Sequence, residues 1–192
     1  MKVLSYIVPS LGARLANRSL KPDSIVESLT PDEWLAALIE WPNLVAASEA
    51  LFNTDLSRIQ RLEDKLRSWQ QYVTLLIPFA AGLVGAAIGK KLLWPSLAGV
   101  LAAGHLLAAL LVSMAGTGGR RIYYPTTMDI NEAANTDVDP SLSLAVARLR
   151  SLELNAPVSL QLNNHIWAAG LSLVWAVGLL LVGLVLLLPV LL

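Results

Sequence analysis

Two long uncharged runs, separated by two lysines, constrain this chain more than any other part of its sequence. The first run covers residues 72–89 and the second covers residues 92–114, with Lys90 and Lys91 between them. Neither run contains Asp, Glu, Lys or Arg. A helix needs about 20 apolar residues to cross about 30 Å of hydrocarbon. The two runs therefore predict a transmembrane hairpin.

A third uncharged run extends from Ile166 to Leu192 and predicts a third span. Only 15% of the chain is charged, against about 25% in an ordinary soluble domain. The predicted fold is therefore an all-α membrane protein with three transmembrane helices. We expect residues 1–71 to form a helical cytosolic region. Residues 115–165 are expected to form a cytosolic loop and amphipathic helix, followed by the third span at residues 166–192.

Helix-boundary signals subdivide the region before the first span. Thr30-Pro31-Asp32-Glu33 is a capping box with proline at the first helical position. Another helix begins near Asn43, and Asn53-Thr54-Asp55 is expected to end it, with Asp55 as the next cap. Apolar residues then recur at steps of three and four, which is the helical period: Leu56, Ile59, Leu62, Leu66, Trp69 and Val73. We therefore expect one long helix to run from the aqueous side into the first span.

The segment between the second and third spans is polar at first. Residues 129–139 are acidic and predict a solvated loop. Asp139-Pro140 predicts a helix start, because aspartate caps helices and proline is favoured at the first position. Asn155-Ala-Pro157 predicts a turn or a restart before the third span.

Basic residues near the span ends predict the orientation, because they favour the cytoplasmic side. One side carries eight of them: Arg58, Arg61, Lys65, Arg67, Arg120, Arg121, Arg148 and Arg150. The other side carries only Lys90 and Lys91. We therefore expect the N-terminus and the central loop in the cytoplasm and the C-terminus outside.

Small residues four apart predict close helix packing in lipid. Each span carries such a row: Ala81, Gly85 and Gly89 in the first; Gly99 and Ala103 in the second; Ala168, Ser172 and Ala176 in the third. The rows serve packing within one chain or between copies. Three helices present more faces of small residues than packing within one chain uses, so we expect homo-oligomerisation as readily as packing within one chain.

Polar residues at membrane depth are the other candidate sites. His105 lies near the middle of the second run, and an ionisable group at that depth suggests a functional site. A functional His105 would line a pore, relay protons or approach a cofactor. The alternative is a neutral imidazole that is hydrogen-bonded to a backbone carbonyl or to Ser96, Ser113 or Thr74. Asn163, Asn164 and His165 stand at the entrance of the third span, where they cap the helix or contact headgroups or a ligand.

The sequence gives no support for an enzyme. Common catalytic and phosphate-binding motifs are absent, and so are cysteines. Fourteen basic residues balance fourteen acidic ones, so the net charge does not predict a nucleic-acid partner. We expect no cofactor or metal. The expected partners are the lipid bilayer and either further copies of the chain or other membrane subunits.

Three segments in the last two-thirds of the chain carry a resemblance to a known group. They are Arg121-Ile-Tyr-Tyr-Pro125, the helix from Ser141 to Leu154, and Leu162-Asn-Asn-His-Ile-Trp-Ala-Ala169. Together with the preceding hairpin, this order resembles the small bacterial membrane effectors of antiphage signalling, the Pycsar-type and SLATT-type proteins. The resemblance implies an oligomer of a bacterial inner membrane that perturbs the bilayer when a signal is sensed. It assigns no role to a single residue.

The predicted function is therefore that of a non-enzymatic, oligomeric inner-membrane protein acting in antiviral defence as a signal-responsive effector. The alternative is an accessory subunit of a respiratory, photosynthetic or transport complex, in which the spans cover a partner. A proton- or metal-handling site at His105 is the third hypothesis.

Overall fold

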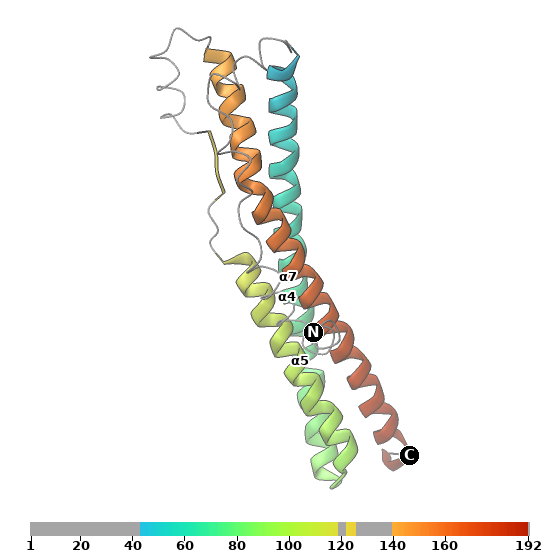
Figure 1. Cartoon of the computed structure of the whole chain (residues 1–192). Coiled ribbons are helices and arrows are strands. Elements are labelled where there is room, and N and C mark those ends of the chain that lie inside the picture. The colour runs from blue at the N-terminus through green and yellow to red at the C-terminus, as the bar shows by residue number, and fades with distance from the viewer. Residues whose placement is uncertain (1–42, 119–121, 126–139, 192) are drawn as a thin grey trace, which may run out of the picture. The chain divides into compact units, whose positions relative to one another are not determined.

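The computed structural model describes residues 43–118, 122–125 and 140–191. They contain three helices, α4 (Leu44–Gly89), α5 (Leu93–Thr117) and α7 (Pro140–Leu191), shown in Figure 1. Each is long and apolar enough to cross a membrane. The all-α, three-span part of the predicted fold is confirmed, and it supports a multi-pass membrane protein. The capping box at Thr30, the basic pair Arg120 and Arg121, and the acidic loop at residues 129–139 lie outside the described residues.

The helices divide into two compact units. The first, here called the three-helix unit, falls within Leu62–Gly118 and Gln161–Leu192. The second, here called the two-helix unit, comprises the described residues 43–61, 122–125 and 140–160. Helices α4 and α7 each contribute one part to each unit, whereas α5 belongs to the three-helix unit alone.

Helix α4 is continuous where the sequence predicted a boundary. The Thr54 hydroxyl donates to the Ala50 carbonyl oxygen (2.7 Å), and the Ser57 hydroxyl donates to that of Asn53 (2.8 Å). These polar side chains are therefore satisfied inside the helix instead of competing with it. The predicted cap at Asp55 is wrong, because that residue lies in the middle of a helix that also buries Phe52 and Ile59.

Helix α7 begins at Pro140, as predicted, and it continues through Pro157 without a turn. The predicted turn or restart at Asn155-Ala-Pro157 is therefore wrong. An asparagine ends a helix when its side chain bonds to the nearby backbone. The Asn155 amide instead bonds to the main chain of Tyr123, 32 residues earlier, so it does not compete with the helix around it.

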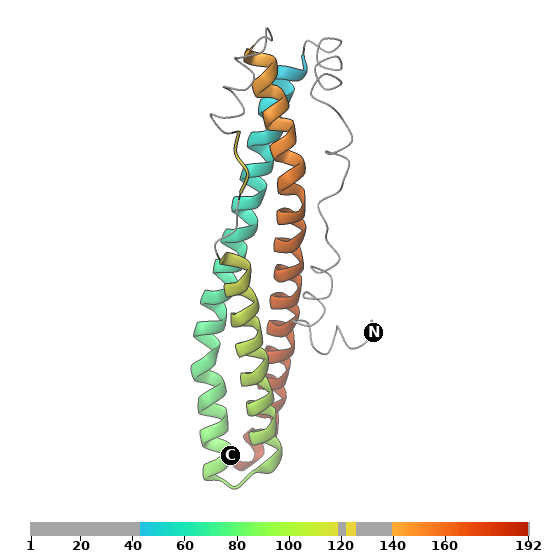
Figure 2. The same ribbon diagram turned by 60° about the vertical axis from the view of Figure 1, so that its left-hand side comes forward.

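Buried side chains of the three-helix unit recur every seven residues on all three helices. The series are Leu66, Val73, Ala80 and Ala87 on α4; Pro95, Ala102, Ala109 and Gly116 on α5; Leu162, Ala169, Ala176 and Gly183 on α7. A strict seven-residue repeat is typical of helices that wind around one another with a left-handed twist. The three helices accordingly lie side by side in this unit, and Figure 2 shows the turn that joins α4 to α5 at one end.

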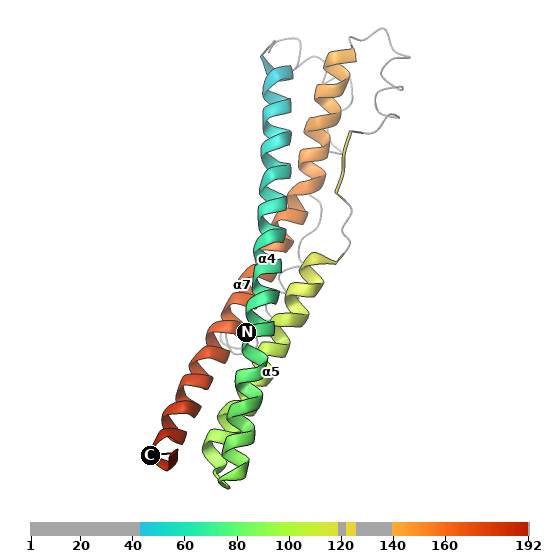
Figure 3. The same ribbon diagram turned by 180° about the vertical axis from the view of Figure 1, so that it is seen from behind.

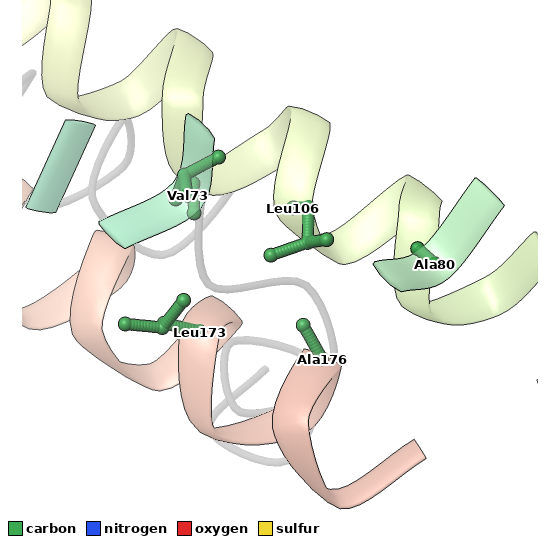
Figure 4. Close-up of a cluster of buried hydrophobic side chains, with 6 residues drawn as sticks. Val73, Ala80, Leu106, Leu173 and Ala176 are labelled. Carbon is green, nitrogen blue, oxygen red and sulfur yellow. The ribbon is translucent and has the colours of Figure 1, made fainter. Parts of the chain in front are cut away.

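The core of the three-helix unit alternates large and small side chains. Val73 and Ala80 from α4, Leu106 from α5, and Leu173 and Ala176 from α7 gather between the helices in Figure 4. Each of these side chains is at most 9% exposed. In lipid such contacts stabilise mainly through van der Waals packing, since lipid tails are as apolar as leucine.

Candidate functional site

Three glycines mark the closest approaches between the spans. A Cβ at Gly99 would lie 2.6 Å from Val84 Cγ2 and 3.4 Å from the Val84 backbone nitrogen. At Gly116 it would lie 2.5 Å from Leu66 Cδ1, and at Gly183 it would lie 2.5 Å from Leu83 Cδ2. A Cβ at Gly99 would meet the branched Val84 side chain, and one at Gly116 or Gly183 would force a leucine side chain to move, so these glycines mark tight contacts in the unit.

Sequence reasoning missed Gly116 and Gly183. Neither glycine belongs to a row of small residues four apart. The seven-residue repeat would have found both, because Gly116 follows Ala102 and Ala109, and Gly183 follows Ala169 and Ala176.

The predicted small-residue rows occupy different surroundings. Ala168, Ser172 and Ala176 on α7 are all 0% exposed, so that row packs inside the chain. Gly99 on α5 is buried and Ala103 is exposed. The α4 row of Ala81, Gly85 and Gly89 is exposed throughout. A Cβ at Gly85 or Gly89 would meet nothing within 4 Å, so the described residues leave the α4 row uncovered.

His105 is half-buried and stacks on Trp175 of α7. The two ring centroids are 6.3 Å apart, and the planes differ by 23°. The structure shows no hydrogen bond from His105 to Ser96, Ser113 or Thr74 among the described residues; each of these hydroxyls donates to a carbonyl oxygen of its own helix. Among the described residues, none forms a hydrogen bond with the His105 ring, and no three His, Asp or Glu side chains gather as metal ligands would.

The predicted entrance of the third span lies well inside α7. Asn163 is exposed, whereas Asn164 and His165 are half-buried. The His165 Nδ1–H donates to the Gln161 carbonyl oxygen at 2.7 Å. These residues do not cap a helix, because α7 begins at Pro140. His165 instead packs against Gly116 of α5, with its Cβ 3.2 Å from where a Gly116 Cβ would be.

The best-defined polar contact joins Asn155 to the segment Ile122–Pro125 in the two-helix unit. The Tyr123 N–H donates to Asn155 Oδ1 (2.9 Å), and Asn155 Nδ2 donates to the Tyr123 carbonyl oxygen (3.0 Å). The asparagine is 0% exposed. The Tyr124 ring meets the Phe52 ring edge-on, with centroids 6.2 Å apart. We call this arrangement the Asn155 clasp: it fastens a non-helical segment to α7 through its backbone and to α4 through an aromatic ring.

The two-helix unit also buries polar atoms without partners. Asp55 Oδ2, Glu153 Oε2 and Ser159 Oγ are inaccessible and make no hydrogen bond. Asp55 precedes the apolar run of α4 by 17 residues, counting from Tyr72. Burial raises the pKa of the Asp55 carboxyl, and the nearby Arg58 guanidinium offsets part of that rise. The charged form of Asp55 is therefore a destabilising feature of this unit.

Asp55→Asn is expected to stabilise the protein at neutral pH, because it removes this charge and keeps the shape. The folded pKa lies above the unfolded one, so stability from this group is greatest below the unfolded pKa and falls as pH rises through the folded pKa. The gain from Asp55→Asn should therefore shrink as the pH falls toward 4. Thermal unfolding across pH measures it, with the exposed Asp64→Asn on the same helix as control. An equal gain at every pH would contradict this assignment.

Comparison with protein-family models, with curated proteins and with solved structures finds no match for this chain.

Proposed function

We propose that the chain is a non-enzymatic, oligomeric protein of a bacterial inner membrane that perturbs the bilayer when a signal reaches its cytoplasmic part. The observation that carries the proposal is the uncovered α4 row of Ala81, Gly85 and Gly89. Small residues at this spacing let two helix backbones approach closely in lipid, where packing is the main attraction. The row therefore suits a second copy of the chain.

The proposed orientation rests on the distribution of charge. Arg58, Lys65 and Arg148 belong to the basic group on one side of the spans, while Lys90 and Lys91 occupy the turn between α4 and α5. The positive-inside rule then assigns the two-helix unit to the cytoplasm and the lysine turn to the opposite side. A cysteine introduced at Lys90 and treated with an impermeant reagent tests this orientation, and labelling of intact cells is expected. Labelling that occurs only after cell lysis would show the opposite orientation.

Helix continuity supports the idea that a cytoplasmic signal reaches the spans. Helices α4 and α7 each pass from the two-helix unit into the three-helix unit without a break. A ligand or partner that changes the Asn155 clasp would act on both helices, because the clasp contacts Phe52 of α4 and α7 itself. The bilayer response would then be a change in how the spans of neighbouring copies pack.

Membrane potential in cells expressing the protein tests the proposal. Expression under activating conditions, including phage infection, should depolarise the membrane. Gly85→Leu should abolish the effect and lower the oligomer mass in mild detergent, because the bulky side chain separates the α4 rows. Gly104→Leu is the matched control, since a Cβ at Gly104 also meets open space. Unchanged potential with the wild-type chain under every condition would refute the proposal.

His105 and Trp175 favour the alternative of an accessory subunit. Both carry polar ring nitrogens at the depth of the apolar spans, and Trp175 is 46% exposed. An exposed polar ring in hydrocarbon suits contact with another membrane protein. Mass analysis of the same detergent preparation separates the two functions: foreign subunits in fixed ratio would support the accessory role, and further copies of this chain would support the effector.

A further inference from the structure

An apolar pocket opens between α4 and α7 beside the lysine turn. Its volume is about 390 Å³, within the range of about 300–1,000 Å³ typical of ligand sites. It is lined by Pro78, Phe79, Gly82, Leu83, Ala86, Leu184 and Leu187. Leu83 and Leu187 are 8% and 4% exposed and form its floor, whereas Phe79 is 69% exposed and stands at its rim.

The turn beside this pocket holds two exposed cations in a defined geometry. The Leu92 N–H donates to the Ala87 carbonyl oxygen, and the Lys91 N–H donates to that of Ile88, both at 2.9 Å. This pair of bonds is the Schellman ending of a helix, in which glycine is usual at the left-handed position. Here Lys91 occupies that position with φ 56°. The two backbone hydrogen bonds thus fix both lysines directly at the end of α4.

The charge of the turn is not neutralised by the described chain. Lys90 and Lys91 are exposed and make no ion pair with a described residue. The sequence contains no acidic residue between Asp64 and Asp129 and none after Glu153. Seen from behind in Figure 3, the turn and the C-terminal end of α7 lie at the same end of the three-helix unit. An anionic group is therefore the electrostatic complement of this end.

The dimensions match one leaflet of a bilayer. At about 1.5 Å per residue, Pro78 and Ala86 lie about 12 Å apart along α4, and Ala86 lies about 6 Å from Lys90. Half of the hydrocarbon core measures about 15 Å. A molecule with an anionic head at the lysines would thus reach the full length of the pocket with one acyl chain.

We propose that this end of the three-helix unit is a binding site for an anionic phospholipid, with its phosphate at Lys90 and Lys91 and one acyl chain in the pocket between α4 and α7. Gly82 and Ala86 leave space for the acyl chain of the lipid, because neither residue carries a side chain beyond Cβ. The site uses other residues of α4 than the row proposed for oligomerisation, and the two adjoin, because Gly82 and Ala86 directly follow Ala81 and Gly85.

Photolabelling of the full-length protein in phosphatidylcholine vesicles tests the proposal. The vesicles contain a few per cent of phosphatidylglycerol with a diazirine in its acyl chain, or the same probe built on phosphatidylcholine. Labelled residues are mapped by mass spectrometry. We expect labels at residues 78–86 and 184–187, several-fold more from phosphatidylglycerol than from phosphatidylcholine.

Two variants separate the head and chain contributions. Lys90→Gln with Lys91→Gln should lower phosphatidylglycerol labelling to the phosphatidylcholine level. Gly82→Leu should fill the pocket and lower labelling by both probes several-fold, whereas Gly104→Leu should leave it unchanged. Thermal unfolding of each variant establishes that it is folded. If Gly82→Leu fails to fold, Leu83→Ala replaces it. This variant enlarges the pocket and should therefore increase labelling.

Equal labelling by the two probes in the wild-type chain would overturn the assignment of an anionic lipid. If Gly82→Leu left the labelling unchanged, the acyl chain would not lie in this pocket. A drop in oligomer mass with Gly82→Leu, together with labels absent from residues 78–86, would assign the pocket to a second copy instead.

Discussion

Gly99→Leu should destabilise the three-helix unit by about 3 kcal/mol, the upper part of the usual range for overpacking a core. A Cβ at this position would already lie 2.6 Å from the Val84 side chain, and 3.4 Å and 3.6 Å from backbone atoms of Val84 and Ala80. A side chain could rotate away, but the backbone of α4 cannot move without disturbing the helix. The new leucine must therefore separate α5 from α4.

Gly104→Leu is the matched control on the same helix. It makes the same chemical change five residues later, where a Cβ meets nothing within 4 Å. Its effect should stay within about 0.5 kcal/mol, as for surface changes that touch no packed feature. Unfolding of both variants in detergent, followed by helical circular dichroism, measures the difference. Equal stability of the two variants would contradict the close approach at Gly99.

The sequence was sufficient for the spans because hydropathy over 18 or more residues is a strong signal. It was also sufficient for the start of α7, where Asp139-Pro140 precedes the helix. It failed at Asn53-Thr54-Asp55 and at Asn155-Ala-Pro157. Each of these segments contains residues that favour helix ends when their side chains bond to the free backbone groups there. Thr54 bonds instead to the Ala50 carbonyl inside the helix, and Asn155 bonds to Tyr123, which lies 32 residues away.

The candidate site, too, could be predicted from the sequence only in part. His105 stands out in the sequence because it is ionisable and surrounded by apolar residues, but its partner Trp175 is 70 positions away. The Asn155 clasp depends on a contact over 32 residues. Its one sequence signal is periodic: Asn155 precedes Leu162, Ala169 and Ala176 at seven-residue steps. An asparagine in a buried repeat position needs a polar partner, but the repeat does not show that the Tyr123 main chain supplies it.

Asn155→Ala should destabilise the two-helix unit by about 3 kcal/mol. The change removes both partners of the Tyr123 main chain at once, and each buried polar group left unsatisfied costs about 1–3 kcal/mol. The main chain of Tyr123 should then no longer be held on α7, so chymotrypsin should cleave after Tyr123 faster than in the wild-type chain. Asn163→Ala, at an exposed position of the same helix, should alter neither stability nor cleavage by a measurable amount.

Asn155→Asp separates the two hydrogen bonds of the clasp. An ionised aspartate still accepts from the Tyr123 N–H, but it has no proton to donate to the Tyr123 carbonyl oxygen and it buries a charge. A protonated aspartate restores that donor. Its folded pKa should therefore lie above the unfolded value, so the variant should be least stable at neutral pH and regain stability as the pH falls through the folded pKa. Asn155→Ala has no such group, so its loss relative to wild type should not shrink in the same way. If Asn155→Asp instead lost as much stability at acidic pH as at neutral pH, the side chain would not be acting as the donor that holds Tyr123 on α7.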